Sequence, residues 1–173
     1  MLAHLLTRRV GLGLALCLAM GGVMVTASAA QVDIGFGGVA HDASQPVEVT
    51  SDSLTIDQST GEAVFSGNVI VLQGDLRMSA PQVRVFYSET DGRRGVDEVL
   101  ATGGVLMTRG ADAAEGREAR YDVDTALLTM TGDVLVTQGP TVVAGDRMVV
   151  NMATGAGSVG GRVRTVFDTG NDP

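Results

Sequence analysis

A glycine-led apolar motif recurs along the chain, and it constrains the fold more than any other feature of the sequence. The copies are Gly67-Asn68-Val69-Ile70-Val71, Gly103-Gly104-Val105-Leu106-Met107, Gly132-Asp133-Val134-Leu135-Val136 and, more weakly, Gly161-Arg162-Val163-Arg164-Thr165. Their spacings are 36, 29 and 29 residues, and the similarity between the copies at 67 and 132 extends well beyond the motif. Asp57 and Thr60, for example, recur as Asp122 and Thr125. We therefore expect a fold built from similar units stacked side by side.

Each unit follows a pattern of strand, turn and strand. In the first unit, strands are expected at 47–49, 54–57, 63–65, 69–72, 76–78 and 83–87, with turns at 58–61 and 73–75. Turn signals every 8–10 residues are typical of an all-β stack, sandwich or barrel, and no long window after the first thirty residues has helical periodicity. The repeated glycine predicts a positive φ or a bulge where one strand passes into the next. Gly92-Arg93-Arg94-Gly95 is expected to form a loop.

Composition excludes several classes of function. The 12 basic residues are all arginine and face 20 acidic residues, for a net charge of −8. This balance disfavours nucleic-acid binding, and the absence of lysine excludes a P-loop and Schiff-base chemistry. Cys17, His4 and His41 are the only cysteine and histidines, too few for nucleophilic Cys/His catalysis or a multi-ligand metal site. We expect no catalytic residues, no metal and no cofactor.

Two patterns that superficially suggest chemistry do not support it. Gly155-Ala156-Gly157-Ser158-Val159-Gly160 has the spacing of a dinucleotide-binding loop, but a β-like segment follows it where a helix is needed. The adjacent acids Asp97 and Glu98 point to opposite faces of a strand and cannot act as a pair.

The N-terminus has the features of an export signal. Arg8 and Arg9 precede an apolar stretch at 10–25, and small residues at Ala27 and Ala29 suit signal peptidase. We expect cleavage after Ala29 or Ala30, with residues 1–29 as the leader and a retained membrane anchor as the alternative. A flexible segment is expected at 30–44 because its residues are mostly glycine and polar, followed by one β domain at 45–167 and a tail at 168–173.

Several strands are apolar on both faces, which suggests an apolar ligand held between two layers of strands. The candidate lining residues are Val47, Val49, Ile56, Val69, Val71, Val105, Met107, Tyr121, Val134, Val136, Met148 and Val150. Sequence pattern alone favours the alternative that these are ordinary core residues.

Four stretches in order give the chain a resemblance to the LptA, or OstA-like, family of periplasmic lipopolysaccharide-transport proteins. They are 45–52, with its proline and alternating valines, 65–74 around Gly67, 128–134 with the following Gly145-Asp146-Arg147-Met148, and 161–167. Together they cover about residues 45–167. The resemblance implies a single open, V-shaped β-jellyroll of many short antiparallel strands. It also implies that the groove binds the acyl chains of lipopolysaccharide, and that Val47 and Val49 face this groove.

The resemblance further implies partners that join by pairing their edge strands. These are further copies stacked head to tail, an LptC-like domain at the inner membrane and an LptD-like domain at the outer membrane. The function predicted is thus a non-enzymatic periplasmic carrier that moves lipopolysaccharide from the inner to the outer membrane. The alternatives are a membrane-anchored LptC-like relative and a structural β-solenoid module that binds no lipid. A polysaccharide-active enzyme would need carboxylates clustered on one face, which the sequence does not show.

Overall fold

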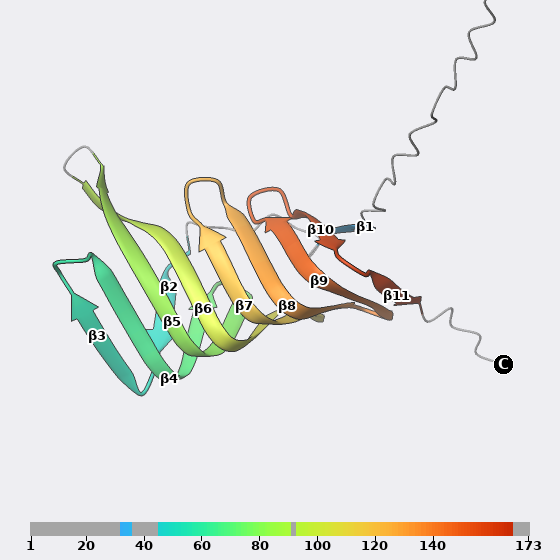
Figure 1. The fold of residues 1–173 in the computed structure, drawn as a ribbon, viewed down its shortest axis with the longest axis horizontal. Coiled ribbons are helices and arrows are strands. Elements are labelled where there is room, and N and C mark those ends of the chain that lie inside the picture. The colour runs from blue at the N-terminus through green and yellow to red at the C-terminus, as the bar shows by residue number, and fades with distance from the viewer. Residues whose placement is uncertain (1–31, 36–44, 91–92, 168–173) are drawn as a thin grey trace, which may run out of the picture.

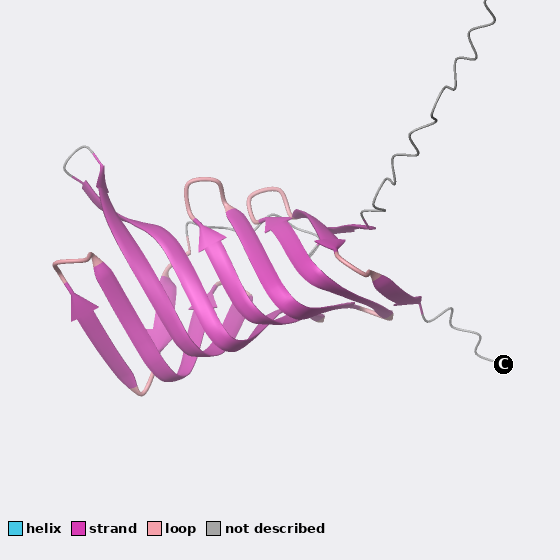
Figure 2. Ribbon diagram, viewed as in Figure 1, coloured by secondary structure: helices cyan, strands magenta, loops and turns pink. Residues whose placement is uncertain are grey.

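The structure, a computed structural model, describes residues 32–35, 45–90 and 93–167, and within these ranges every regular element is a strand (Figure 2). The strands are β1 (Val32–Gly35), β2 (Val47–Thr50), β3 (Ser53–Asp57), β4 (Glu62–Gln73), β5 (Leu76–Thr90), β6 (Arg93–Arg109), β7 (Asp112–Asp122), β8 (Leu127–Gln138), β9 (Thr141–Asn151), β10 (Ala156–Gly160) and β11 (Arg164–Phe167). No helix long and apolar enough to cross a bilayer occurs in the described part of the chain. The predicted leader (1–29) and tail (168–173) lie outside the described residues, and so does most of the segment 30–44 that was expected to be flexible. Its residues 32–35 differ from that expectation, because they form β1.

All eleven strands belong to one antiparallel sheet, in which β4 to β9 pair in chain order. At one end, β2 and β3 both pair with β4, and at the other end β10 and β11 both pair with β9. The two ends lie at opposite sides of the molecule (Figure 1). The sheet does not close on itself, so the predicted all-β, open antiparallel architecture is confirmed.

Bulges bend the long strands, and in β4, β6 and β8 they fall at the repeated glycine. Bulges interrupt the pairing between Ser66 and Val69, Ser79 and Gln82, Thr102 and Val105, Glu115 and Glu118, and Thr131 and Val134. We call this row of bulges across β4–β8 the corner line. The predicted positive φ is found at Gly67 (79°), Gly103 (92°), Gly132 (83°) and Gly161 (74°).

One expectation about where the strands end was wrong. The sequence predicted separate strands on either side of residues 67 and 81, whereas β4 and β5 each run through these positions. A bulge bends a strand and lets the hydrogen-bond ladder resume after one or two residues, so a corner does not require the strand to end. Residues 93–95 also differ from the predicted loop, because they belong to β6 and pair with residues 88–90 of β5. Gly92 lies outside the described residues.

The corner line divides the sheet into two halves that face each other. The β3 half contains residues 62–66, 82–86, 98–102, 118–122, 127–131 and 147–151, with β3 at one edge and β10, followed by β1, at the other. The β2 half contains residues 69–73, 76–80, 105–109, 112–116, 134–138 and 141–145, edged by β2 and β11.

Hydrogen bonds and an ion pair stabilise the corner at both ends of the sheet. At the first end, the Asp52 amide donates to the Gly67 carbonyl at 2.9 Å, and the Asn68 side-chain amide donates to the Asp52 carboxylate at 2.9 Å. At the other end, the Arg162 guanidinium pairs with the Asp146 carboxylate at 3.1 Å. Each pair joins the terminal strands to the neighbouring long strand where the chain crosses from one half to the other.

The repeated turn residues have the same role in both copies. The Asp57 carboxylate accepts hydrogen bonds from the amide and hydroxyl of Ser59, and Asp122 accepts both from Thr125. These hydrogen bonds lower the pKa of each carboxyl below its usual value, because they favour the charged form. Both residues end a strand just before a hairpin turn, so the similarity at an offset of 65 residues reflects equivalent turns.

Candidate functional site

One face of both halves is apolar and turned inward. Buried residues alternate with polar ones along β4–β9, and the cluster they form runs the length of the sheet. It contains Ala63, Val69, Ala80, Val83, Val85, Ala101, Val105, Met107, Ala114, Ala119, Leu128, Met130, Val134, Val136, Val143, Met148, Val150, Met152 and Val159. The two halves thus bury a continuous apolar layer between them.

All twelve candidate lining residues lie on this inner face, at different depths. Seven belong to the buried cluster: Val69, Val105, Met107, Val134, Val136, Met148 and Val150. Val49, Val71 and Tyr121 are partly buried against it, while Val47 and Ile56 are exposed. Facing positions in the ladder place Val49 opposite Val71 and Ile56 opposite Ala63, which puts these side chains on the inner face. The candidates are therefore brought to one face, most of them as core.

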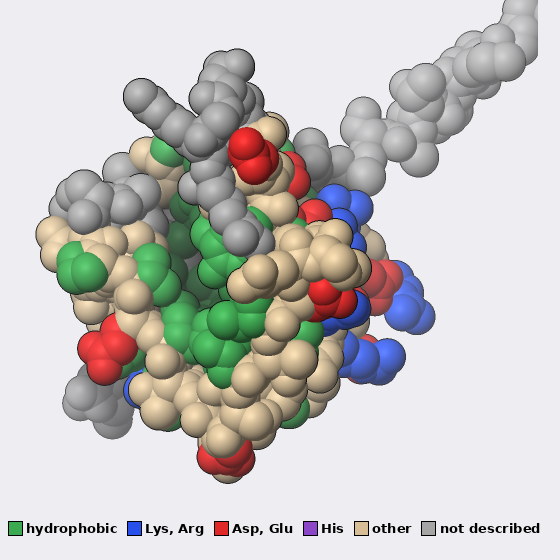
Figure 3. Space-filling view, turned by 90° about the vertical axis from the view of Figure 1, so that its left-hand side faces the viewer, with side chains coloured by type: hydrophobic (Ala, Val, Ile, Leu, Met, Phe, Trp, Pro, Cys, Tyr) green, Lys and Arg blue, Asp and Glu red, His purple; other side chains and the backbone are tan. Residues whose placement is uncertain are grey.

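The inner face is open at the end formed by β2 and β3. Val47 is 58% exposed and Ile56 is 60% exposed, although both lie on the apolar side of their strands. Figure 3 looks onto this end and shows hydrophobic side chains lining a hollow between the two walls of the sheet. We call this opening the β2/β3 mouth. At this mouth the inner face is accessible without displacement of the buried cluster.

Two residues of the mouth were not among the candidates predicted from the sequence. Leu54 is 50% exposed and faces Phe65 across the β3–β4 ladder, and Phe65 itself packs against the buried cluster. The signal was present in the alternation of Leu54, Thr55 and Ile56, which places Leu54 on the same face as Ile56.

The inner face is rich in methionine. Every methionine in the β domain lies in the buried cluster or packs against it: Met78, Met107, Met130, Met148 and Met152. A thioether side chain is unbranched and adapts its shape more easily than leucine or valine. Tyr121 adds a phenol whose pKa is raised by burial and by the neighbouring Asp122 charge, so the ring stays neutral. The lining is thus uncharged and deformable.

Polar residues border the apolar lining on the β2 half. Each lies two positions beyond a lining residue on the same strand, and so shares its face: Gln73 after Val71, Arg109 after Met107, and Gln138 after Val136. Arg109 is mostly buried and its guanidinium pairs with the Asp75 carboxylate at 3.0 Å. The inner face therefore changes from apolar to polar toward the ends of the strands.

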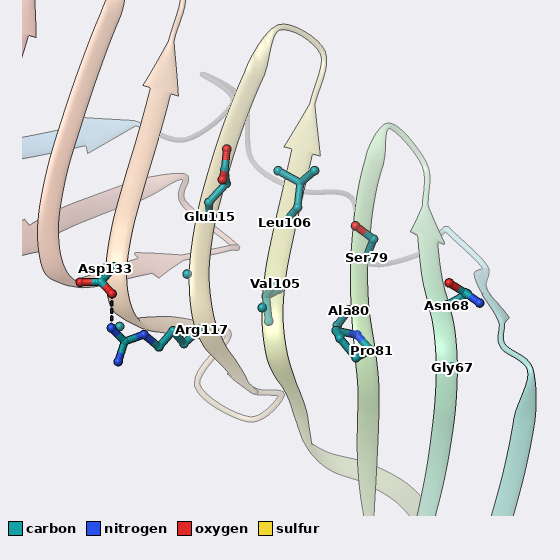
Figure 4. A pocket seen from close by; sticks show the side chains of 13 residues that line it. Gly67, Asn68, Ser79, Ala80, Pro81, Val105, Leu106, Glu115, Arg117 and Asp133 are labelled. Carbon is teal, nitrogen blue, oxygen red and sulfur yellow. Dashed lines mark hydrogen bonds and ion pairs between the residues drawn. The ribbon is translucent and has the colours of Figure 1, made fainter.

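A second depression lies outside the hollow, over the corner line (Figure 4). It has a volume of about 630 Å³ and is lined by Ser79, Leu106, Glu115 and the Arg117–Asp133 ion pair, among others. Ser79, Leu106 and Glu115 alternate with the inward-facing Ala80, Val105 and Gly116, so this depression is on the outer surface. It shares almost none of the predicted lining residues.

The described residues offer no metal site. No three of their histidine, cysteine, aspartate or glutamate side chains come close enough to hold a metal ion. The sequence with dinucleotide-loop spacing lies in a turn and in β10, so no helix N-terminus is present there to receive a phosphate. The feature that remains is the apolar inner face with its open mouth.

Comparison with known proteins connects this architecture to one family. Residues 48–156 match the family described as LptA/(LptD N-terminal domain) LPS transport protein. An uncharacterized protein of Rhizobium meliloti (strain 1021) is 31% identical over 133 residues, which cover 72% of each chain. The lipopolysaccharide export system protein LptA of Escherichia coli K12 is 26% identical over 116 residues, or 64% of this chain and 62% of that protein. The match thus spans less than two thirds of the E. coli relative.

A solved structure shows the same fold. LptH of Pseudomonas aeruginosa, titled as the LptA-homologous periplasmic component of a lipopolysaccharide transport device, superposes with a TM-score of 0.64. The sequence identity is 20%, and the match covers 72% of this chain and 96% of that one. The predicted β-jellyroll is therefore confirmed.

Proposed function

The chain belongs to the family of LptA and LptD N-terminal-domain lipopolysaccharide transport proteins, and on this basis we propose that it is a periplasmic carrier whose hollow shields the acyl chains of lipopolysaccharide. Proteins of this family transport and do no chemistry, so the chain is not an enzyme. The observation that carries the proposal is the open β2/β3 mouth, where Val47, Leu54 and Ile56 are exposed on the apolar inner face.

Burial energetics supports this choice of ligand. Each methylene group transferred from water to an apolar surface gains about 0.8 kcal/mol, so a long acyl chain has a strong tendency to enter such a hollow. The buried cluster fills the middle of the hollow, and its methionines and small residues allow the two halves to separate around inserted chains. The polar border at Gln73, Arg109 and Gln138 suits an amphiphile whose headgroup stays near water.

The strands at the two ends of the sheet are the proposed binding sites for partner chains. β2 and β3 at one end, and β11 at the other, pair on only one side within the described residues. An unpaired strand edge accepts a strand from another chain. Copies stack head to tail through these edges, and the terminal copies join an LptC-like domain at the inner membrane and an LptD-like domain at the outer membrane. Export through the predicted leader places the protein between the two membranes.

Substitutions on β2 test the lipid-binding hollow. Val47→Asp and Val49→Asp each place a carboxylate on the inner face, and we expect binding of fluorescent lipopolysaccharide to weaken at least tenfold because a buried charge opposes acyl contact. Thr50→Asp is the matched control, because it adds the same charge to the same strand on the outer face. Binding is measured on the exported protein by titration, and circular dichroism verifies that each variant is folded.

Each result supports or contradicts the lipid-binding hollow or the carrier function. Loss of binding in the two valine variants, with Thr50→Asp unchanged, supports the hollow and its mouth. Binding unchanged in all three variants contradicts the assigned site. A folded parent that binds no lipopolysaccharide overturns the carrier and favours the structural module. Deacylated lipopolysaccharide serves as the ligand control, because competition by it would show that the sugar is recognised and the acyl chains are not.

A further inference from the structure

The N-terminal strand β1 covers the far end of the sheet. Val32 pairs with Val159, Ile34 pairs with Gly157, and the strands run antiparallel. Although β1 precedes β2 in the sequence, it lies at the opposite end of the sheet from β2 (Figure 1). In the β3 half, the edge beside β10 is thus occupied by the chain's own N-terminal segment.

The two halves consequently end differently. In the β2 half the last strand is β11, which pairs with β9 and has no second partner in the described ranges. In the β3 half the corresponding strand is β10, and β1 forms one additional strand beyond it. The β3 half therefore extends one strand further than the β2 half, a distance of about 4.8 Å.

Strand direction shows what β1 displaces. Every pairing in the sheet is antiparallel, so directions alternate from β3 through β4–β10 to β1, and β1 runs the same way as β3. By the same alternation, β11 runs opposite to β2. A second copy that places its β2 beside β11 continues the antiparallel order. Its β3 continues that order only beside β10, which is the position that β1 holds.

We propose that β1 is a cap on the stacking surface, and that the β3 strand of a second copy must displace it from β10 when copies join head to tail. With β1 in place, the incoming β3 lies beside a parallel strand, one strand spacing farther out than the incoming β2 beside β11. The two halves of the sheet then cannot both form antiparallel pairs with the second copy. This inference rests on the stacking in the proposed function and adds that the free protein limits its own assembly.

The short length of β1 and its position at the edge suit a displaceable strand. It has four residues and pairs on one side, to a β10 strand of five residues that includes Gly157 and Gly160. Edge strands of this length open more easily than central ones. β3, with five residues on an edge of its own, offers a replacement one residue longer than β1.

A reversible disulfide provides the test. Asp33 and Ser158 face each other in the β1–β10 ladder, and the Cα separation of facing antiparallel residues lies within the range that a disulfide spans. Asp33→Cys/Ser158→Cys is made in the full chain with Cys17→Ser, exported and purified. Sedimentation velocity over a concentration series then measures self-association with the disulfide formed and after its reduction. We expect association at least tenfold weaker when the disulfide is formed.

A second variant opens the cap. Asp33→Pro/Ile34→Pro removes two successive amide hydrogens, and neighbouring residues of a strand present their amides to opposite sides, so one of the lost hydrogens faces β10. We expect association about tenfold tighter than that of the parent. Ala40→Pro/His41→Pro, with the same number of prolines outside β1, is the control and is expected to match the parent.

Other outcomes overturn the cap in distinguishable ways. Equal association of the disulfide-bonded and reduced forms means that β1 need not leave β10. Weaker association of the proline variant means that β1 is donated to the neighbour's β10. If every variant, including the proline variant, remains monomeric, the stacking in the proposed function fails together with the cap. Lipopolysaccharide binding, measured separately, tests the hollow in each case.

Discussion

At the scale of single residues, Gly67 shows why the repeat begins with glycine. Its φ of 79° lies in the left-handed region, and a Cβ built there would overlap the Asp52 side chain. Asp52 cannot move away freely, because its amide donates to the Gly67 carbonyl and its carboxylate accepts from Asn68. Backbone conformation and close approach therefore both require glycine at this position.

Gly67→Ala is expected to destabilise the protein by about 2–3 kcal/mol. A left-handed conformation costs a non-glycine residue about 1–2 kcal/mol, and displacing Asp52 loses further hydrogen bonds worth about 1 kcal/mol. Urea unfolding followed by circular dichroism measures the difference. Gly110→Ala is the control, because Gly110 also has a positive φ (58°) but open space where the Cβ would lie. Equal losses in the two variants would show that the contact with Asp52 contributes nothing.

Residue types predicted part of the corner and not the rest. The glycines at 67, 103, 132 and 161 were expected to have positive φ, and they do. The following residues, Asn68, Asp133 and Arg162, also have positive φ. Asparagine and aspartate tolerate this conformation, so the first two carry a weak signal in the sequence. Arg162 carries none, and only its ion pair with Asp146 distinguishes its position.

At the scale of elements, the main difference between sequence and structure is strand length. Within residues 62–73 and 76–90, separate strands were predicted on either side of Gly67 and Pro81, because both residue types weaken a strand. The structure uses these same residues to bend β4 and β5 without ending them. Whether a bulge ends or bends a strand depends on the neighbouring strand bulging at the same level, which no single segment of sequence specifies.

Hydrogen exchange is expected to separate the elements into two groups. Strands β4–β9 pair on both sides and contain most of the buried cluster, so their amides should exchange slowly, close to the rate of global unfolding. The short strands β2, β3, β10 and β11 lie at the ends and should exchange faster. Mass spectrometry of peptides after timed exchange measures this order. Uniform protection along the chain would contradict it and would indicate that the ends are held as firmly as the centre.

At the scale of the whole molecule, the repeat predicted an all-β stack, sandwich or barrel, the family resemblance implied the open β-jellyroll, and neither predicted the state of the site. All twelve candidate lining residues share the inner face, as the alternation along each strand implied. Their exposure differs widely: Val134 in β8 is 1% exposed, whereas Val47 in the terminal strand β2 is 58% exposed. Sequence alternation gives the face and carries no information on which strands lie at an end.

Processing of the leader decides between the carrier and its membrane-anchored alternative. We expect the exported protein to begin at Ala30 or Gln31, because Ala27 and Ala29 suit signal peptidase. Intact mass spectrometry of protein from the periplasmic fraction gives the N-terminus directly. An Ala27→Leu/Ala29→Leu variant should retain the leader and move to the membrane fraction. A parent that itself keeps residues 10–25 and sediments with membranes would instead favour the LptC-like form.

The pairing of β4–β9 in chain order has a consequence for how the size of such a protein can change. Each hairpin touches only its neighbours, so the centre of the sheet behaves as a one-dimensional array with specialised ends. Inserting or deleting one strand would reverse the direction of every strand after it and make the two ends incompatible. Adding or removing two strands leaves the ends unchanged. Such a molecule can therefore lengthen or shorten only in hairpin increments of about 10 Å.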